Sequence, residues 1–334
     1  MLCSVPIGRE GGYHVEWAGV SGVSGGNSMA MKTALVLSGG GAKGAFQVGA
    51  LRYLHEQGYT WDVIAGVSVG ALNGTMLAMD AFDELEALWR TVTPAQVLTG
   101  RMNIWALVRM LFGARSIYGN EPLWEMIIEK VRLEKIRADL RIGVVSLRTG
   151  RYFAFRPDDF VNAPPPGFDD PELAFKRAIL ASTAMPVIWP PVDIPPLYSA
   201  MVDGGVRNIS PLGDVLDAEP DEVVVINCSP AEPGELETPP RNVLQIALRS
   251  LEVALDEIFH TDTREFLRIN RNVREAAEAG VTLHNESGKP FKYYRHLIIQ
   301  PDAPLDDTLD FSRPAIMRSL RAGYAKAKEV LGAR

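Results

Sequence analysis

Two stretches in which a short apolar run, a glycine-rich turn and an amphipathic segment follow one another constrain the fold most. The first is "TALVLSGGGAKGAFQVGALRYLHEQG", residues 33–58, and the second is "VIAGVSVGALNGTMLAM", residues 63–79. Apolar runs and helical patterns continue to alternate as far as a closing amphipathic segment at 312–332. This alternation predicts an α/β fold with a mostly parallel sheet.

One segment departs from the parallel pattern. "RIGVVSLRTGRYFAF", residues 141–155, consists of two apolar runs joined by Arg148-Thr149-Gly150. Such a short glycine-containing connection is typical of an antiparallel hairpin. Proline-rich segments at 157–171, 186–196 and 230–240 are expected to be surface loops.

Composition excludes several classes of function. The chain has 334 residues, of which 47% are hydrophobic, and a net charge of −7. This acidic balance lacks the excess of positive charge that nucleic-acid-binding proteins use to bind phosphates. The two cysteines, Cys3 and Cys228, form neither a disulfide framework nor a metal-ligand cluster, so a reducing, cytoplasmic compartment is expected. No apolar run approaches the roughly 18 residues of a membrane span.

The first 31 residues differ from the rest of the chain. They are rich in glycine and serine, show no hydrophobic period, and lack the basic start and apolar core of a secretory signal. We expect residues 1–31 to be a disordered or cloning-derived lead, with Met29 or Met31 as the start of the protein. Residues 32–334 are then expected to form a single domain.

The segment Gly66-Val67-Ser68-Val69-Gly70 fits the pattern G-x-S-x-G, with an apolar strand before it and a helical pattern after it. In that setting the serine occupies a tight strand-to-helix turn, where its hydroxyl is exposed as a nucleophile and the helix dipole favours developing negative charge. The simpler alternative is that Ser68 caps the helix, and one residue can do both.

A nucleophilic serine needs a base. Of the five histidines, His284 and His296 follow Ser68 in the chain order of a Ser-Asp-His triad, but neither has a local signature. Asp203 precedes two glycines in "MVDGGVRNISPL" and ends a short apolar stretch. A partly buried carboxylate hydrogen-bonded to a hydroxyl can accept a proton during attack. Read alone, Asp-Gly-Gly is more often a turn.

The glycine loop after the first strand, Gly39 to Gly44, also satisfies G-x-G-x-x-G. A dinucleotide site is disfavoured, because the acid that should bind the ribose is missing from the end of the second strand. A Walker A loop is excluded, because Lys43 is followed by Gly44 and not by serine or threonine. The backbone N–H groups of Gly40, Gly41 and Ala42 are therefore expected to stabilise an oxyanion.

Taken in order, "GGGAKG", "GVSVG", "ASTAMPVIWPPV" and "DGG" resemble the patatin-like phospholipases, acyl hydrolases with a Ser-Asp dyad. The resemblance spans residues 33 to about 210 and implies a three-layer α/β/α sandwich with a mostly parallel central sheet. It implies ester hydrolysis of phospholipid or related acyl-ester lipids, without metal or other cofactor. The residues it assigns are Ser68 as nucleophile and Asp203 as base; Gly66 and Gly70 in the nucleophile elbow; Gly204 and Gly205 in the turn after the base; and Gly39, Gly40, Gly41, Ala42, Lys43 and Gly44 in the oxyanion hole.

Several alternatives stay open at this point. A soluble esterase or thioesterase, a non-catalytic lipid-binding protein on the same fold and, third, a nicotinamide-dependent oxidoreductase compete with the lipid hydrolase. Lys43, where the family often has arginine, serves either to steer a phosphate or to hold the loop. The apolar segment 103–113 is more readily a packed helix than a lipid-contacting flap. The sequence leaves peripheral membrane contact and oligomeric state undecided.

Overall fold

A computed structural model describes residues 31–97, 99, 115–161, 170–232, 235, 239–285 and 288–333. The predicted lead over residues 1–31 lies outside this part except for Met31, and so does the whole apolar segment 103–113. No described helix is both long and apolar enough to cross a membrane.

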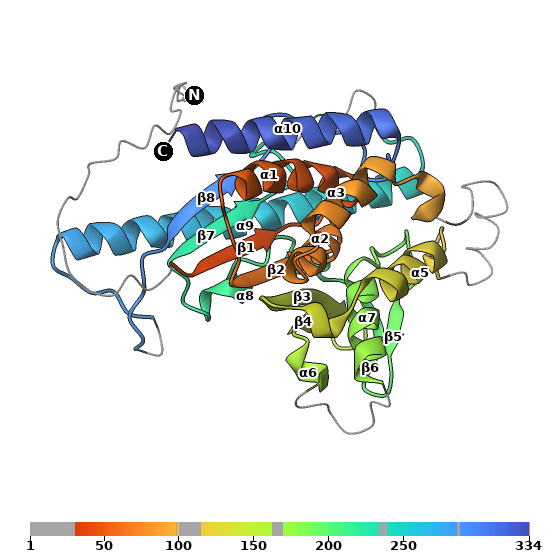
Figure 1. The fold of residues 1–334 in the computed structure, drawn as a ribbon, viewed down its shortest axis with the longest axis horizontal. Coiled ribbons are helices and arrows are strands. Elements are labelled where there is room, and N and C mark those ends of the chain that lie inside the picture. The colour runs from red at the N-terminus through yellow and green to blue at the C-terminus, as the bar shows by residue number, and fades with distance from the viewer. Residues whose placement is uncertain are drawn as a thin grey trace, which may run out of the picture.

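The centre of the molecule is an eight-stranded sheet in the order β5-β6-β3-β2-β1-β7-β8, with β4 also paired to β3 (Figure 1). Strands β3, β2, β1, β7 and β8 are parallel, whereas β4, β5 and β6 run antiparallel to their neighbours. The strands are β1 Thr33–Leu37, β2 Val63–Val67, β3 Asp139–Ser146, β4 Tyr152–Phe155, β5 Val192–Ile194, β6 Tyr198–Asp203, β7 Glu222–Ile226 and β8 Arg295–Ile299.

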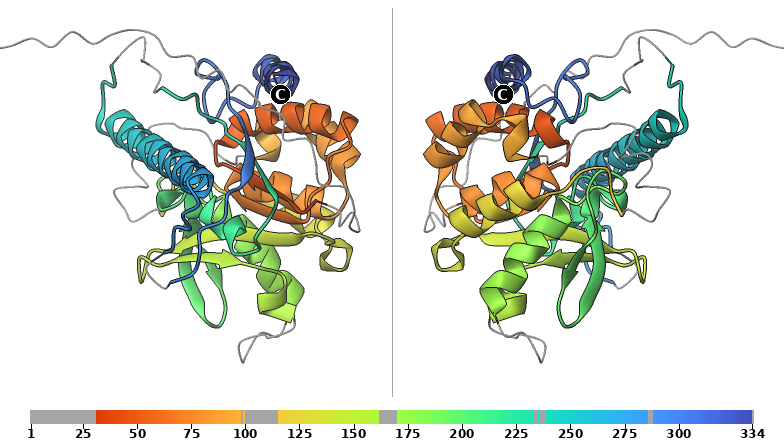
Figure 2. Two further views of the ribbon diagram at one scale, coloured as in Figure 1. Left: turned by 90° about the vertical axis from the view of Figure 1, so that its left-hand side faces the viewer. Right: turned by 90° about the vertical axis from the view of Figure 1, so that its right-hand side faces the viewer.

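Helices cover both faces of this sheet, which gives the three layers predicted (Figure 2). Successive strand residues point to opposite faces. Leu35 and Leu37 therefore contact one core with α1, α2, α3, α7 and α10, while Ala34 and Val36 contact a second core with α8 and α9. The helices are α1 Gly44–Glu56, α2 Val69–Ala78, α3 Phe82–Thr91, α5 Glu121–Lys130, α6 Asp158–Val161, α7 Pro171–Ser182, α8 Gly213–Leu216, α9 Val243–Glu278 and α10 Arg313–Gly332.

The α/β class and the mostly parallel sheet are confirmed, and so is the hairpin of β3 and β4, which turns at Gly150 with φ 66°. Two predictions are wrong. The proline-rich segment 157–171 is not all loop, because Asp158–Val161 forms helix α6, whose Phe160 is buried against Phe155 and Phe175. The proline-rich segment 186–196 is not all loop, because Val192–Ile194 pairs with β6 as strand β5. Sheet hydrogen bonds with a distant strand outweigh the local effect of the prolines, which lie beside the strand.

The register on β3 explains how two distant parts of the chain meet. Strand β4 pairs with Ile142–Val145 and therefore occupies one edge of β3. Strands β2 and β6 share the other edge, end to end, because β2 pairs with residues 139–143 and β6 with residues 144–146. Val67, the last residue of β2, is opposite Gly143, and Asp203, the last of β6, is opposite Val144. The residues that follow both strands therefore lie close together.

Candidate active site

Ser68 lies on the turn between β2 and α2, in a backbone conformation that L-residues rarely adopt. Its φ is 57° and its ψ −128°. Strain of this kind persists only where the surrounding structure imposes it. The side chain is buried, 6% exposed, and makes no capping hydrogen bond to α2. The alternative role of Ser68 as a side-chain helix cap is therefore wrong, and its hydroxyl points elsewhere.

Two glycines allow this turn. A Cβ on Gly66 would collide with the carbonyl group of Gly70, and a Cβ on Gly70 would lie 2.7 Å from the carbonyl carbon of Leu37 in β1. Real Cβ atoms do not approach backbone that closely. The glycines at both ends of G-x-S-x-G are thus required by backbone packing, as the motif predicts.

Asp203 ends β6 beside Ser68 and is 4% exposed. Its Oδ1 accepts a hydrogen bond from the Gly205 N–H at 2.8 Å, and the Ser68 side chain lies close enough to the carboxyl group to lower its pKa. Burial raises the pKa of Asp203 to about 7, and the Gly205 N–H and the nearby Ser68 side chain oppose the rise. A carboxyl group with a pKa near neutrality is a stronger base than an ordinary aspartate.

The turn after Asp203 is as crowded as the turn at Ser68. A Cβ on Gly204 would meet the carbonyl group of Gly143, the residue of β3 opposite the end of β2. A Cβ on Gly205 would lie 2.7 Å from Ile209 Cδ1 and 3.0 Å from Asp203 Oδ1. The Asp-Gly-Gly segment is therefore both a tight turn and the support of a buried carboxylate.

The glycine loop lies against the same turn, because a Cβ on Gly39 would be 3.2 Å from Ser68 Cβ. Gly40 and Gly41 have φ of 154° and 56°. Within the described part of the chain, neither of their N–H groups has a hydrogen-bond partner. The Ala42 N–H, by contrast, donates to the Thr308 carbonyl at 2.8 Å. The expectation that Ala42 contributes an oxyanion donor is therefore wrong, and two candidate donors remain.

Sequence reasoning missed Ser182, the last residue of α7. Its hydroxyl accepts a hydrogen bond from the Ser68 N–H at 3.0 Å and donates one to the Gly143 carbonyl at 2.7 Å. It is fully buried. Ser182 thus ties the nucleophile turn to β3 at the point where β2 ends. It lies in "ASTAMP", a segment whose sequence resembles the family but carries no local signal for a role at Ser182.

An apolar cavity of about 130 Å³ opens beside Ser68 and Gly41 and extends between α2, α3 and α5. Its lining surface is mostly apolar, so it suits a hydrocarbon chain better than a polar ligand. The cavity-lining apolar residues include Leu72, Met76, Leu85, Leu88, Trp89, Val92, Leu123, Met126, Ile127, Met185, Trp189 and Phe311.

Lys43 points toward α9, where its ammonium group lies 3.7 Å from a carboxylate oxygen of Glu252. This ion pair favours the loop-holding role over the phosphate-steering role. Among the described residues, no group of three or more His, Cys, Asp or Glu side chains is arranged to hold a metal ion.

The two candidate triad histidines, His284 and His296, lie away from the dyad. His296 pairs with Val223 near the start of β7, at the amino-terminal edge of the parallel strands, whereas Ser68 follows the carboxyl end of β2. His284 forms an isolated bridge with Pro290 in a loop after α9. This arrangement disfavours a Ser-Asp-His triad.

Comparisons with known proteins agree with this fold. The profile of the family described as Patatin-like phospholipase matches residues 35–216, which is more than half of the chain. The uncharacterized protein YqhO of Bacillus subtilis is 25% identical over 221 residues, covering 62% of this chain and 74% of that protein. A patatin-like phospholipase domain-containing protein of Caenorhabditis elegans, ZK370.4, is 29% identical over 177 residues, covering 53% of this chain and 12% of that protein.

Two further matches are shorter or more distant. Lysophospholipase nte1 of Aspergillus terreus is 53% identical over 47 residues, which are 14% of this chain and 3% of that protein. The crystal structure of VipD from Legionella pneumophila aligns with a TM-score of 0.44 and 13% identity, covering 91% of this chain and 67% of that chain. The chain thus spans a small part of the worm and fungal relatives. On the profile match, it belongs to the patatin-like phospholipase family.

Proposed function

We propose that this protein is a lipid acyl hydrolase that cleaves carboxylic esters through a Ser68 acyl-enzyme, with Asp203 as the base. The observation that carries the proposal is that the buried, strained Ser68 lies beside the buried carboxyl group of Asp203, whose pKa is raised to about 7. Perturbed titration beside a positioned nucleophile is a mark of functional sites. Membership of the family supports the same reaction class.

The reaction follows from these positions. Ser68 Oγ attacks the ester carbonyl carbon while its proton passes to Asp203. The N–H groups of Gly40 and Gly41 stabilise the resulting oxyanion, and one such donor is typically worth about 3 kcal/mol of barrier. The carbon–oxygen bond to the alcohol then breaks, and Asp203 returns the proton to the leaving oxygen. Water attacks the acyl-enzyme by the same route, which releases the carboxylic acid and free Ser68.

The substrate class is argued from the cavity. An acyl chain attached to the reacting carbonyl would lie in the apolar space along α2, where it is removed from water. Phospholipids and lysophospholipids carry such chains. Delivery of an aggregated lipid would require peripheral contact with a membrane surface, and the activity is proposed for a cytoplasmic protein.

A panel of phospholipids, lysophospholipids and soluble esters, with analysis of the released products, tests this function. Ser68→Ala is expected to abolish turnover and labelling by a fluorophosphonate while leaving the circular dichroism spectrum unchanged. Ester hydrolysis retained in that variant would remove the proposal. Preference for a short soluble ester over every lipid would favour the esterase or thioesterase alternative. Lipid binding without turnover in the wild-type chain would favour a non-catalytic role.

A further inference from the structure

A chain of buried side-chain amides connects the apolar cavity to the glycine loop. Trp89, in the cavity wall on α3, donates its indole N–H to Asn73 Oδ1 on α2 at 2.9 Å. Asn73 Nδ2 donates to Gln47 Oε1 on α1 at 2.9 Å. Gln47 Nε2 donates to the Ser38 carbonyl at 2.8 Å, directly before the glycine loop. Three helices are thereby joined to the end of β1.

This network holds both ends of the loop. Gln47 binds the Ser38 carbonyl at the beginning, and Asn73 Nδ2 also donates to the Gly44 carbonyl at the end, at 3.2 Å. Gln47 is fully buried and Asn73 is 1% exposed. Each of their four amide nitrogen and oxygen atoms has a partner. Satisfied polar networks of this kind are rigid, whereas removal of one member leaves the others unpaired in a low dielectric.

The network also reaches the nucleophile. Asn73 lies five residues after Ser68, on the helix that begins immediately after the nucleophile. The helix that follows Ser68 and the loop that carries the Gly40 and Gly41 N–H groups are therefore joined by one side chain, that of Asn73. Misplacement of a reacting group by about 1 Å can lower a rate by on the order of 10²-fold. A side chain that fixes the glycine loop relative to Ser68 is therefore expected to affect the rate of the reaction.

We propose that Gln47, Asn73 and Trp89 are positioning residues, which fix the glycine loop relative to Ser68 so that its two free N–H groups face the reacting carbonyl. Trp89 extends this control to the cavity wall against which an acyl chain would lie. The inference rests on the proposed function, because it concerns the geometry of that same site. None of the three side chains needs to touch the reacting atoms.

Gln47→Leu and Asn73→Leu remove the amides with little change in volume, and Trp89→Phe removes the indole N–H while keeping an aromatic wall. We expect kcat for p-nitrophenyl octanoate to fall by on the order of 10²-fold in the two leucine variants, with KM nearly unchanged. Trp89→Phe removes one donor at the far end and is expected to have a smaller effect in the same direction.

Asn270→Leu is the matched control. Asn270 on α9 is 3% exposed and, like Asn73, donates from its Nδ2 to a backbone carbonyl, that of Tyr294, at 2.7 Å. Its loss should lower the melting temperature as Asn73→Leu does, because both leave buried polar groups unpaired, but kcat at a temperature where both proteins are folded should stay at the wild-type value. An unchanged kcat in Asn73→Leu, or an equal fall in Asn270→Leu, would overturn the positioning role.

Hydrogen exchange separates this inference from the proposed function. The peptide that covers Ser38–Gly44 should exchange faster in Asn73→Leu and Gln47→Leu than in the wild type, but not in Asn270→Leu. If the wild-type chain hydrolyses no ester, the proposed function is wrong, and the exchange rates still decide whether the network fixes the loop. Equal exchange in all four proteins would refute the network whatever the activity.

Discussion

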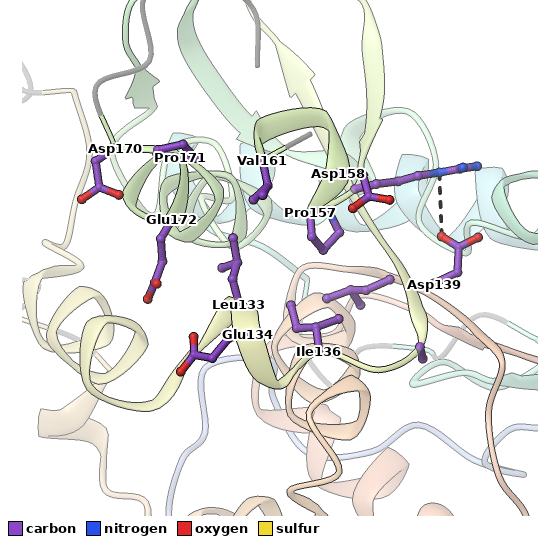
Figure 3. A pocket seen from close by; sticks show the side chains of 13 residues that line it. Leu133, Glu134, Ile136, Asp139, Pro157, Asp158, Val161, Asp170, Pro171 and Glu172 are labelled. Atoms are coloured by element: carbon purple, nitrogen blue, oxygen red, sulfur yellow. Dashed lines mark ion pairs between the residues drawn. The ribbon is translucent and has the colours of Figure 1, made fainter. Parts of the chain in front are cut away.

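Two very different depressions lie at opposite ends of the parallel strands, which we call the carboxyl edge and the amino edge of the sheet. At the carboxyl edge, Ser68 and Asp203 lie buried beside an apolar cavity of about 130 Å³. At the amino edge, near the start of β3, a more open depression of about 650 Å³ lies among carboxylates (Figure 3). The labelled acidic side chains are spread around it, and Asp139 pairs with Arg156 at 3.8 Å, the dashed line of Figure 3.

The larger volume of the acidic depression does not make it the more reactive site, because the two depressions differ in how far their carboxyl groups are removed from water. The carboxyl groups of the amino edge are partly solvated, and that of Asp139 is 36% exposed and ion-paired. The carboxyl group of Asp203, at the carboxyl edge, is desolvated by burial, and its pKa is raised to about 7. Strands β1 and β2 end in glycine turns at the carboxyl end of the sheet, and the Gly204-Gly205 turn after β6 meets them there, so backbone and side-chain groups from separate segments converge.

The largest difference between the edges should appear on removal of one carboxylate from each. Asp203→Asn is expected to lower kcat/KM for p-nitrophenyl octanoate by about 10³-fold, because it removes the base. Asp139→Asn, at the amino edge, should leave the rate unchanged. Loss of activity in His296→Ala together with full activity in Asp203→Asn would instead establish a triad and overturn the dyad.

A pH profile gives the second largest effect. If Asp203 must be ionised to accept the proton, kcat/KM falls as pH is lowered through about 7, by roughly tenfold for each further pH unit. At pH 5 the loss is then on the order of 10²-fold. The residual activity of Asp203→Asn should lack this inflection. A wild-type profile that is flat between pH 5 and 8 would contradict the assignment of the base.

Filling the apolar cavity should change selectivity by a smaller factor. Met126→Trp on α5 places a larger side chain at the cavity wall. The ratio of rates for p-nitrophenyl octanoate and p-nitrophenyl acetate should fall by about tenfold, since only the longer acyl chain needs the space. The matched control is Ile128→Trp, two residues along on the exposed side of the same helix. Equal ratios in both variants would show that the chain binds elsewhere.

The melting temperature of Asp203→Asn should depend on pH differently from that of the wild type. The folded-state pKa of Asp203 lies above the ordinary value of 3.8. Between about pH 4 and about pH 7 the carboxyl group is therefore ionised in the unfolded chain but still protonated in the folded chain, so the free energy of unfolding falls as pH rises. Asparagine preserves the acceptor for the Gly205 N–H without the charge. Its melting temperature should therefore exceed that of the wild type by several degrees at pH 8. The excess should vanish near pH 4, and a lower melting temperature at pH 8 would contradict the raised pKa.

The smallest effect is expected at the acidic depression itself. Glu134 lies at its margin and is exposed (Figure 3). Glu134→Gln should leave kcat unchanged and alter the free energy of unfolding by no more than about 0.5 kcal/mol, as is usual for exposed side chains. Urea denaturation and the octanoate assay check both values. A marked fall in kcat would mean that the two edges communicate.

Local sequence patterns were sufficient for the features that depend on neighbouring residues. The strand, glycine turn and helix around Ser68 follow from apolar periodicity and from turns that leave no room for a Cβ, and so does the hairpin at Gly150. Asp203 and the glycine loop were also found as motifs. Each of these signals is contained within a few residues of the chain, where propensity and turn chemistry act.

Only the tertiary structure decided which of these motifs meet and which groups remain free. The ends of β2 and β6 adjoin because both pair with one edge of β3, a register set by long-range hydrogen bonds. The Ala42 N–H donates to the Thr308 carbonyl and is therefore not free to bind an oxyanion. Ser182, more than a hundred positions along the chain, accepts a hydrogen bond from the Ser68 N–H. Burial, which raises the pKa of Asp203, is likewise a property of the assembled core, because desolvation depends on every segment that surrounds the carboxyl group.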